Sequence, residues 1–180
     1  LNFQNANLLE VIKENDPAGD LYRKQGFEPL RGLNCYVAPK DALSVSPPPD
    51  GIELVNLPMD ALGWDRLRTF WDFDPSWQNS VDSVMAVPET LAAVTAMADG
   101  QVVGYGIVEP KTGDLSHLAV SPDHRGKGIG KAILTKLADL TEGENLVALN
   151  LDEASQAANA FVEAVGFAPY TAQYEMMLQL

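Results

Sequence analysis

A glycine-rich loop between two apolar stretches constrains this chain more than any other feature. Its core is Arg-Gly-Lys-Gly-Ile-Gly-Lys, residues 125–131. Residues 115–120, before the loop, are mostly apolar and β-compatible. In residues 131–140, after it, apolar side chains recur at helical spacing. The sequence therefore predicts a strand, a tight loop and a helix in that order.

This loop is typical of an anion site. Glycine lacks a Cβ, so a glycine-rich backbone can approach a ligand closely. The first amides of a helix have no intrahelical partner and, with the helix dipole, attract a pyrophosphate. Arg125, Lys127 and Lys131 add positive charge in a chain with only 12 basic residues against 25 acidic ones. The alternative interpretation is a glycine-rich turn with solvated lysines.

Two common phosphate loops do not fit the sequence. A Walker loop requires Ser or Thr after its Gly-Lys pair, whereas Ala132 follows Gly130 and Lys131. A dinucleotide fingerprint requires Gly-x-Gly-x-x-Gly, and the position of its third glycine is Lys131.

Residues 118–130, Leu-Ala-Val-x-Pro-x-x-Arg-Gly-Lys-Gly-Ile-Gly, resemble the acetyl-CoA signature of the GNAT superfamily of acyl-CoA-dependent N-acyltransferases. The resemblance implies an α/β (α+β) fold with a mixed central sheet flanked by helices. It also implies that loop amides bind the pyrophosphate of coenzyme A and that the preceding strand pairs with the pantetheine. The cofactor-binding residues that it implies are Leu118, Ala119, Val120, Arg125, Gly126, Lys127, Gly128, Ile129, Gly130, Lys131 and Ser155.

The length, charge and cysteine content of the chain limit the classes of protein to which it can belong. A chain of 180 residues is long enough for one well-buried domain with a small extra piece. Its net charge of −13 argues against binding to nucleic acid or to an anionic membrane and favours a cationic or neutral small partner. A single cysteine, Cys35, fits a reducing compartment, so we expect a cytoplasmic protein without a signal peptide. A homodimer is compatible with this composition. Because the chain starts at Leu1, we interpret it as a fragment of something longer.

The two ends of the chain share one order of strand, helix, Gly-Phe and strand. Aligning Gly26 with Gly166 gives an offset that also brings Leu21 onto Phe161. We interpret this as an internal repeat, with coincidence as the alternative because the pattern is common. Residues 1–40 are then a partial GNAT-like repeat, 41–50 a proline-rich linker and 51–180 a complete GNAT domain. This organisation resembles tandem members of the family with a truncated first copy.

Local patterns predict the remaining elements. We expect a strand over residues 51–57 and one helix over 58–73. Asp99-Gly100 predicts a hairpin between strands at 91–98 and 102–108. The C-terminal part should hold a strand at 146–151, a helix at 155–165 and a closing strand at 173–180. The aromatic and acidic side chains of residues 58–90 are expected on the acceptor side.

Acetyl transfer to an amine requires removal of one proton and stabilisation or protonation of the leaving thiolate. In the family the base can lie early in the strand before the loop, where Asp114 is the best match. Its alternative role is that of a turn residue in Thr-Gly-Asp. His117, expected on the opposite face of the strand, and Glu109 are further candidates.

The residue that would protonate the leaving thiolate, the general acid, departs from the family pattern. The tyrosine often found in the last helix corresponds to Val162, and an asparagine that often contacts the cofactor corresponds to Ser155. Either the acid is supplied elsewhere, or none is needed, or this copy is impaired. If it is supplied elsewhere, Tyr174 is our candidate, with Tyr170 and the more distant Tyr105 as alternatives, and a structural role is the alternative for each.

The resemblance implies an N-acetyltransferase (EC 2.3.1.-) that transfers an acetyl group from acetyl-CoA to a primary amine of a small molecule, without a metal. A degenerate module that binds CoA without turnover, as a structural or regulatory unit, is the alternative.

Overall fold

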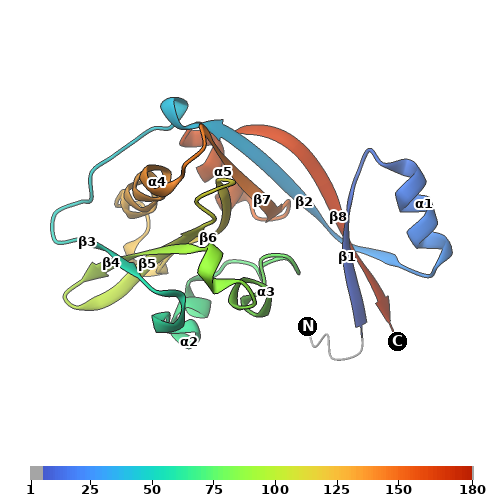
Figure 1. Ribbon diagram of the computed structural model, residues 1–180, viewed down its shortest axis with the longest axis horizontal. Coiled ribbons are helices and arrows are strands. Elements are labelled where there is room, and N and C mark those ends of the chain that lie inside the picture. The colour runs from blue at the N-terminus through green and yellow to red at the C-terminus, as the bar shows by residue number, and fades with distance from the viewer. Residues whose placement is uncertain (1–5, 180) are drawn as a thin grey trace.

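The computed structural model describes residues 6–179 and contains one continuous eight-stranded sheet with helices on both faces (Figure 1). Residues 1–5 of the predicted repeat and residue 180 of the predicted closing strand lie outside the described residues. Strands run in the order β1-β8-β2-β7-β6-β5-β4-β3, with β6 and β7 parallel and the other neighbours antiparallel. The mixed sheet flanked by helices is confirmed. The strands are β1 (Ala6–Ile12), β2 (Glu28–Pro39), β3 (Glu53–Leu57), β4 (Ala92–Ala98), β5 (Gln101–Val108), β6 (Asp114–Val120), β7 (Asn145–Asp152) and β8 (Ala168–Gln179).

One face of the sheet is covered by α4 (Ile129–Leu140), which packs on β4, β5 and β6. Glycines on β5 allow this close packing. A Cβ on Gly106 would lie 2.6 Å from Leu137 Cδ1, and one on Gly104 would lie 3.0 Å from Ile133 Cδ1. The tight fit fixes the loop that precedes α4 against the sheet. No helix within residues 6–179 is long and apolar enough to cross a membrane.

The opposite face is covered by a broken segment rather than by one helix. The helix predicted over residues 58–73 is wrong: η2 (Met59–Ala61), the short α2 (Trp64–Leu67) and η3 (Arg68–Phe70) follow one another. Leu62 is extended, and Gly63 at ψ 79° stops helical propagation between the first two. The apolar side chains still pack against Tyr105 and Ile107 of β5. After this segment, α3 (Val81–Met85) begins at Ser80, whose side chain caps it.

The two ends of the chain are interleaved in the sheet. Strand β2 lies between β7 and β8, and β8 lies between β1 and β2. Ile12 pairs with Gln173, and Leu33 pairs with Asp152. Ile12 and Asp152 are 140 positions apart in the sequence, as are Leu33 and Gln173 and the ion-paired Lys13 and Glu153. Replacing each member of the first pair by the residue 140 positions away therefore gives the second pair. The units β1-α1-β2 and β7-α5-β8 therefore have a symmetric register.

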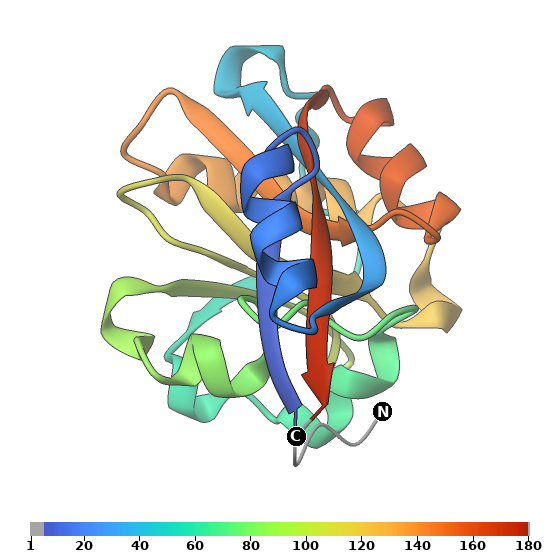
Figure 2. The same cartoon turned by 90° about the vertical axis from the view of Figure 1, so that its right-hand side faces the viewer.

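Two helices accompany these interleaved units. Helix α1 (Asp16–Lys24) begins after Asn15, whose side chain accepts the Ala18 amide, and α5 (Gln156–Ala164) begins after Ser155. Figure 2 shows α1 in front of β1, with β8 beside that strand. Strands from both ends of the chain belong to one sheet. The division into a partial repeat (1–40), a linker (41–50) and a complete domain (51–180) therefore stays a prediction about how the sequence repeats.

The predicted linker lies on the surface of α4. The Ser44 amide donates to the carbonyl oxygen of Val165 at 2.9 Å, and the Ser46 amide donates to Thr135 Oγ1 at 3.1 Å. Leu43 is buried. The segment then passes the glycine loop, where Pro49 lies next to Gly128, before it enters β3.

Candidate active site

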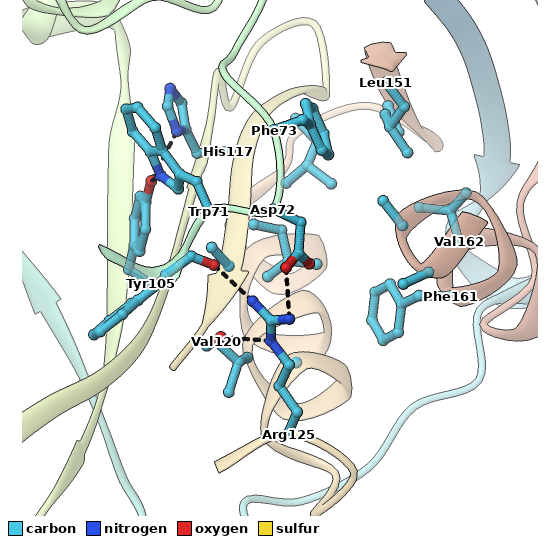
Figure 3. Close-up of a pocket in the computed structure, with 18 of the residues that line it drawn as sticks. Trp71, Asp72, Phe73, Tyr105, His117, Val120, Arg125, Leu151, Phe161 and Val162 are labelled. Carbon is cyan, nitrogen blue, oxygen red and sulfur yellow. Dashed lines mark hydrogen bonds and ion pairs between the residues drawn. The ribbon is translucent and has the colours of Figure 1, made fainter. Parts of the chain in front are cut away.

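A wedge between β6 and β7 forms the centre of the site. The two parallel strands are paired only at Asp114–Val147 and Leu115–Ala148. Beyond Leu115 the described chain offers β6 no strand partner on the β7 side. A cavity of about 430 Å³ opens there, lined by β6, β7, the glycine loop, α5 and residues 70–79 (Figure 3). This volume lies in the range of small-molecule and cofactor sites.

The glycine loop forms one end of the cavity. Gly126 and Gly128 have positive φ angles of 72° and 84°, a left-handed backbone that favours glycine. Gly128 directly precedes α4 and provides no side-chain cap for its first amides. These donors lie in the cavity wall, where the helix dipole favours an anion. The predicted cofactor-binding residues that line the cavity are Leu118, Ala119, Val120, Arg125, Gly126, Gly128, Ile129, Gly130 and Lys131.

Two predicted cofactor-binding residues are not among those that line the cavity. Lys127 donates from Nζ to the carbonyl oxygen of Asp123 at 2.9 Å. Ser155 lies at the start of α5, where its carbonyl oxygen accepts the amide and the side chain of Asn159.

Arg125 lines the cavity, but its guanidinium is bonded to the protein (Figure 3). Nε donates to the carbonyl oxygen of Val120 at 3.0 Å, and Nη2 donates to that of Phe70 at 2.8 Å. Nη1 forms an ion pair with Asp72 at 2.8 Å. Arg125 thus ties the glycine loop to the segment after α2, leaving the helix amides and Lys131 as the main donors to an anion.

A directional chain of hydrogen bonds forms the wall across the cavity from α5. Trp71 Nε1 donates to Tyr105 Oη at 2.7 Å, and Tyr105 Oη lies 2.9 Å from His117 Nδ1. His117 Nε2 lies 2.7 Å from the carbonyl oxygen of Asn79. Because a carbonyl can only accept, Nε2 carries the hydrogen and Nδ1 accepts from the Tyr105 hydroxyl.

Both titratable members of this chain are held uncharged. Burial lowers the pKa of His117 to about 4, although the hydrogen bond to Asn79 acts in the opposite direction. Burial also raises the pKa of Tyr105, against the smaller effects of Trp71 and Arg68. Near neutral pH the cavity wall therefore contains a neutral imidazole and a protonated phenol, whose hydrogen is donated to His117 Nδ1.

The comparisons with known proteins agree with this geometry. Residues 90–169 match a family model described as an acetyltransferase (GNAT) domain. This part of the chain is therefore similar to a GNAT acetyltransferase domain. The matched residues include the wedge, the glycine loop and both helices beside the cavity. No curated protein matches the sequence.

Solved structures share the GNAT fold. A Drosophila protein matches with a TM-score of 0.71 and 14% identity over 100% of this chain and 62% of its own. A GCN5-related N-acetyltransferase from Sphaerobacter thermophilus matches with a TM-score of 0.63 and 17% identity over 99% and 61%. A tandem GNAT protein from the clavulanic acid biosynthesis pathway matches with a TM-score of 0.69 and 17% identity over 97% and 64%. The chain thus spans about three-fifths of the length of these structures.

Asp114 lies at the narrow end of the wedge, where β6 and β7 are paired. With Glu109 it lines a second cavity of about 150 Å³. The two cavities share wall residues, namely Asn79, Leu115, Ser116 and Leu149. The structure thus places Asp114 next to the main cavity and not in its wall.

His117 and Ser116 both line the main cavity, although strand alternation places their side chains on opposite faces. The cavity passes between β6 and β7 and therefore reaches both faces of the sheet. His117 is thereby brought into the main cavity despite the face predicted for it.

The structure does not bring Tyr174 to the cavity. Tyr174 pairs with Val11 in the sheet, and Lys13 Nζ lies 4.8 Å from the centroid of its ring. Tyr170 is exposed, whereas Tyr105 is fully buried and lines the cavity. Val162, at the position of the usual tyrosine, adds an apolar side chain to the cavity wall.

The cavity wall expected on the acceptor side is aromatic, with one acidic side chain. Phe70, Trp71 and Phe73 line the cavity, as expected for some of the aromatic residues of 58–90. Of the acidic residues in that segment, only Asp72 is among the described lining residues, and it is paired with Arg125. The described cavity lining therefore has fewer acidic side chains than expected, and its role in acceptor binding stays a prediction.

Asn150 is a cavity residue that the sequence analysis missed. It has a left-handed backbone at φ 62° and is 2% exposed. Its Oδ1 accepts from Gln173 Nε2 at 3.0 Å, and its Nδ2 donates to Glu10 at 2.7 Å. An asparagine inside an apolar strand is the signal that was available, because asparagine is depleted in strands and tolerates this conformation.

Proposed function

We propose that the chain is an acyl-CoA-dependent N-acetyltransferase that transfers the acetyl group of acetyl-CoA to a primary amine of a small molecule. One observation carries the proposal: a single cavity joins the glycine loop and the first amides of α4 to the wedge between β6 and β7. The amides suit the pyrophosphate, and the free side of β6 around Leu118–Val120 suits the amide groups of pantetheine.

In the proposed reaction the amine nitrogen attacks the thioester carbonyl carbon. The carbon–sulfur bond then breaks, the nitrogen loses one proton and the departing sulfur gains one. Asp114 is the proposed proton acceptor; it lines the second cavity, and the amine must lie where the two cavities meet, at Leu115 and Ser116, for the proton to reach it. Tyr105 is better placed than Tyr174 to donate to the sulfur, because it lines the cavity, and the donation requires its hydroxyl hydrogen to turn from His117 Nδ1 to the sulfur.

A second candidate function is a GNAT module that binds CoA without turnover. Val162 and Ser155, at positions where the family often has tyrosine and asparagine, favour this candidate. The Tyr105–His117 pair favours turnover, because it places a phenol hydrogen in the same cavity, where rotation of the hydroxyl away from His117 Nδ1 would make it available.

The two candidates are separated by incubating the protein with acetyl-CoA and a panel of primary amines. We expect release of free CoA thiol together with an equal amount of N-acetylated amine, detected by mass spectrometry. Calorimetric binding of acetyl-CoA without thiol release on any amine would favour the module. Absence of both binding and release would contradict both candidates.

We also propose that residues 6–39 and 145–179 are two copies of one β-α-β unit. The symmetric register of β1–β8 and β2–β7 supports this. The Leu33–Gln173 pair supports it further, because the same exchange of positions maps this pair onto itself.

A further inference from the structure

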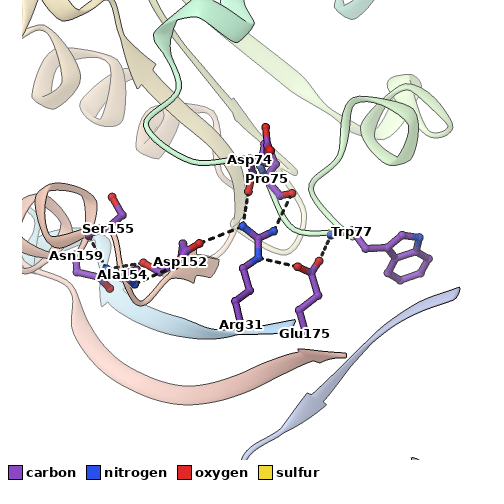
Figure 4. A network of polar contacts seen from close by, with 9 residues as sticks. All are labelled: Arg31, Asp74, Pro75, Trp77, Asp152, Ala154, Ser155, Asn159 and Glu175. Atoms are coloured by element: carbon purple, nitrogen blue, oxygen red, sulfur yellow. Dashed lines mark hydrogen bonds and ion pairs between the residues drawn. The ribbon is translucent and has the colours of Figure 1, made fainter. Parts of the chain in front are cut away.

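The cavity wall at residues 74–79 has no helix or strand of its own and is held by side chains from the far end of the sheet. Arg31 on β2 donates through Nη1 to the carbonyl oxygen of Asp74 at 2.7 Å and through Nη2 to that of Pro75 at 3.1 Å (Figure 4). The Trp77 amide donates to Glu175 Oε1 on β8 at 2.8 Å. Pro75 itself lines the cavity.

The two anchoring side chains also hold each other. Arg31 and Glu175 are register partners, and Arg31 Nε donates to Glu175 Oε2 at 2.6 Å. Arg31 Nη1 additionally contacts Asp152 at 3.2 Å. Burial alone would lower the pKa of Arg31, but its hydrogen bonds and charge attraction to Glu175 and Asp152 outweigh this and raise it. Glu175 is 1% exposed, so the pair is fixed and desolvated.

The anchored segment continues into the hydrogen-bond chain of the cavity. Gln78 donates its amide to Glu10 on β1 at 3.3 Å, and Asn79 Nδ2 donates to the carbonyl oxygen of Leu149 at 3.1 Å. The Asn79 carbonyl oxygen then accepts from His117 Nε2. A continuous set of contacts thus runs from Arg31 through residues 74–79 to His117.

We propose that Arg31 and Glu175 are positioning residues for the acceptor end of the cavity. They fix residues 74–79, and through Asn79 they set the position of the His117 ring. Strands β1 and β2 therefore help to position a wall of the cavity, in addition to extending the sheet. This inference rests on the proposed function in one respect, namely that the amine enters beside this wall.

The test variant is Arg31→Met combined with Glu175→Leu, which removes both charges of the main pair so that neither is left buried and unpaired. Asp152 loses its contact with Arg31 but keeps the hydrogen bond from the Ala154 amide at 2.9 Å. The matched control is Lys13→Met. It removes an ion pair to Glu153 of 2.6 Å that also joins β1 to the turn after β7 but does not reach residues 74–79. Amide hydrogen exchange, the ring nitrogen NMR signals of His117 and calorimetric titration with acetyl-CoA are measured for all three proteins.

In the double variant we expect exchange at the Trp77, Gln78 and Asn79 amides to rise about tenfold or more, because local opening becomes easier. The His117 signals should shift, while the Kd for acetyl-CoA stays within about twofold of that of the parent protein. The control should match the parent in all three measurements. Unchanged exchange in the double variant, or an equal rise in the control, would overturn the proposal.

Arg31→Lys provides the second variant if the double variant does not fold. Lysine keeps the charge near Glu175 but lacks the planar set of donors that reaches two carbonyl oxygens. It should raise exchange at the same three amides, and parent-like exchange would overturn the proposal. With an amine that turns over, KM for that amine should rise more than kcat falls. A parent protein that acetylates no amine contradicts the proposed function but leaves the exchange test intact.

Discussion

Replacing Gly128 with alanine tests how the glycine loop is used. Gly128 has φ 84° and ψ −2°, and the nearest atom to an added Cβ is Pro49 Cγ at 3.8 Å. The methyl group therefore fits in the free protein, and the cost to folding is that of a left-handed alanine, about 1–2 kcal/mol. Gly128 also lines the cavity, so the methyl group would occupy space next to a bound pyrophosphate. We expect acetyl-CoA affinity to fall at least about tenfold, or about 1.4 kcal/mol.

Gly100→Ala is the matched control. Gly100 has φ 75° in the turn between β4 and β5, with no atom within 4 Å of an added Cβ, and is not among the described lining residues. Urea unfolding should show a similar loss of about 1–2 kcal/mol for both variants. Titration calorimetry should show weakened acetyl-CoA binding for Gly128→Ala alone. Parent-like affinity in Gly128→Ala, or equal weakening in both variants, would refute the reasoning.

Three further predictions concern titration and loop anchoring. Burial lowers the pKa of His117 to about 4 in the folded protein from its ordinary value of 6.5, so the unfolded chain binds more protons between these values and stability falls as pH is lowered through them. From pH 7.5 to 5 this costs about 2 kcal/mol. Urea unfolding of His117→Gln should lose that part of the pH dependence, and an unchanged dependence would contradict the cause. Asp114→Asn should lower kcat more at neutral than at high pH, where free amine is abundant, whereas equal loss across a pH–rate profile would indicate a turn residue. Asp72→Asn should change the unfolding free energy by less than about 1 kcal/mol, because the Arg125 pair is partly exposed. It should weaken acetyl-CoA binding in calorimetry by loosening the loop, whereas tighter binding would mean that Arg125 is free to contact phosphate.

Local chemistry made several parts of the fold predictable. Asp99 and Gly100 have positive φ angles of 50° and 75°, the left-handed pair that a two-residue hairpin requires, as their sequence predicts. The strand, glycine loop and helix around Gly128 were equally predictable, because turn geometry and helical spacing depend on residues close together in the sequence. These features depend on neighbours in sequence.

The parts that were missed depend on distant contacts. Strand β2 pairs with β7 and β8, more than 100 residues away, and no local pattern indicates which strands it separates. The role of Arg31 follows from that placement. His117 was expected to point away from the site, because alternation of side chains places it on the opposite face of a continuous sheet. In the structure β6 and β7 separate beyond Leu115, so the cavity between them reaches His117 as well. The long helix over 58–73 was predicted because its apolar spacing outweighed Gly63.

Amide NMR signals of the loop, followed during titration with CoA and with pantetheine, test the central claim most directly. Pantetheine lacks the pyrophosphate but keeps the arm that should pair with β6. We predict that CoA shifts the signals of residues 126–131 strongly and pantetheine much less, while both ligands shift those of residues 116–120. Loop signals that do not respond to CoA, or that respond equally to both ligands, would contradict the assignment of the glycine loop to the pyrophosphate.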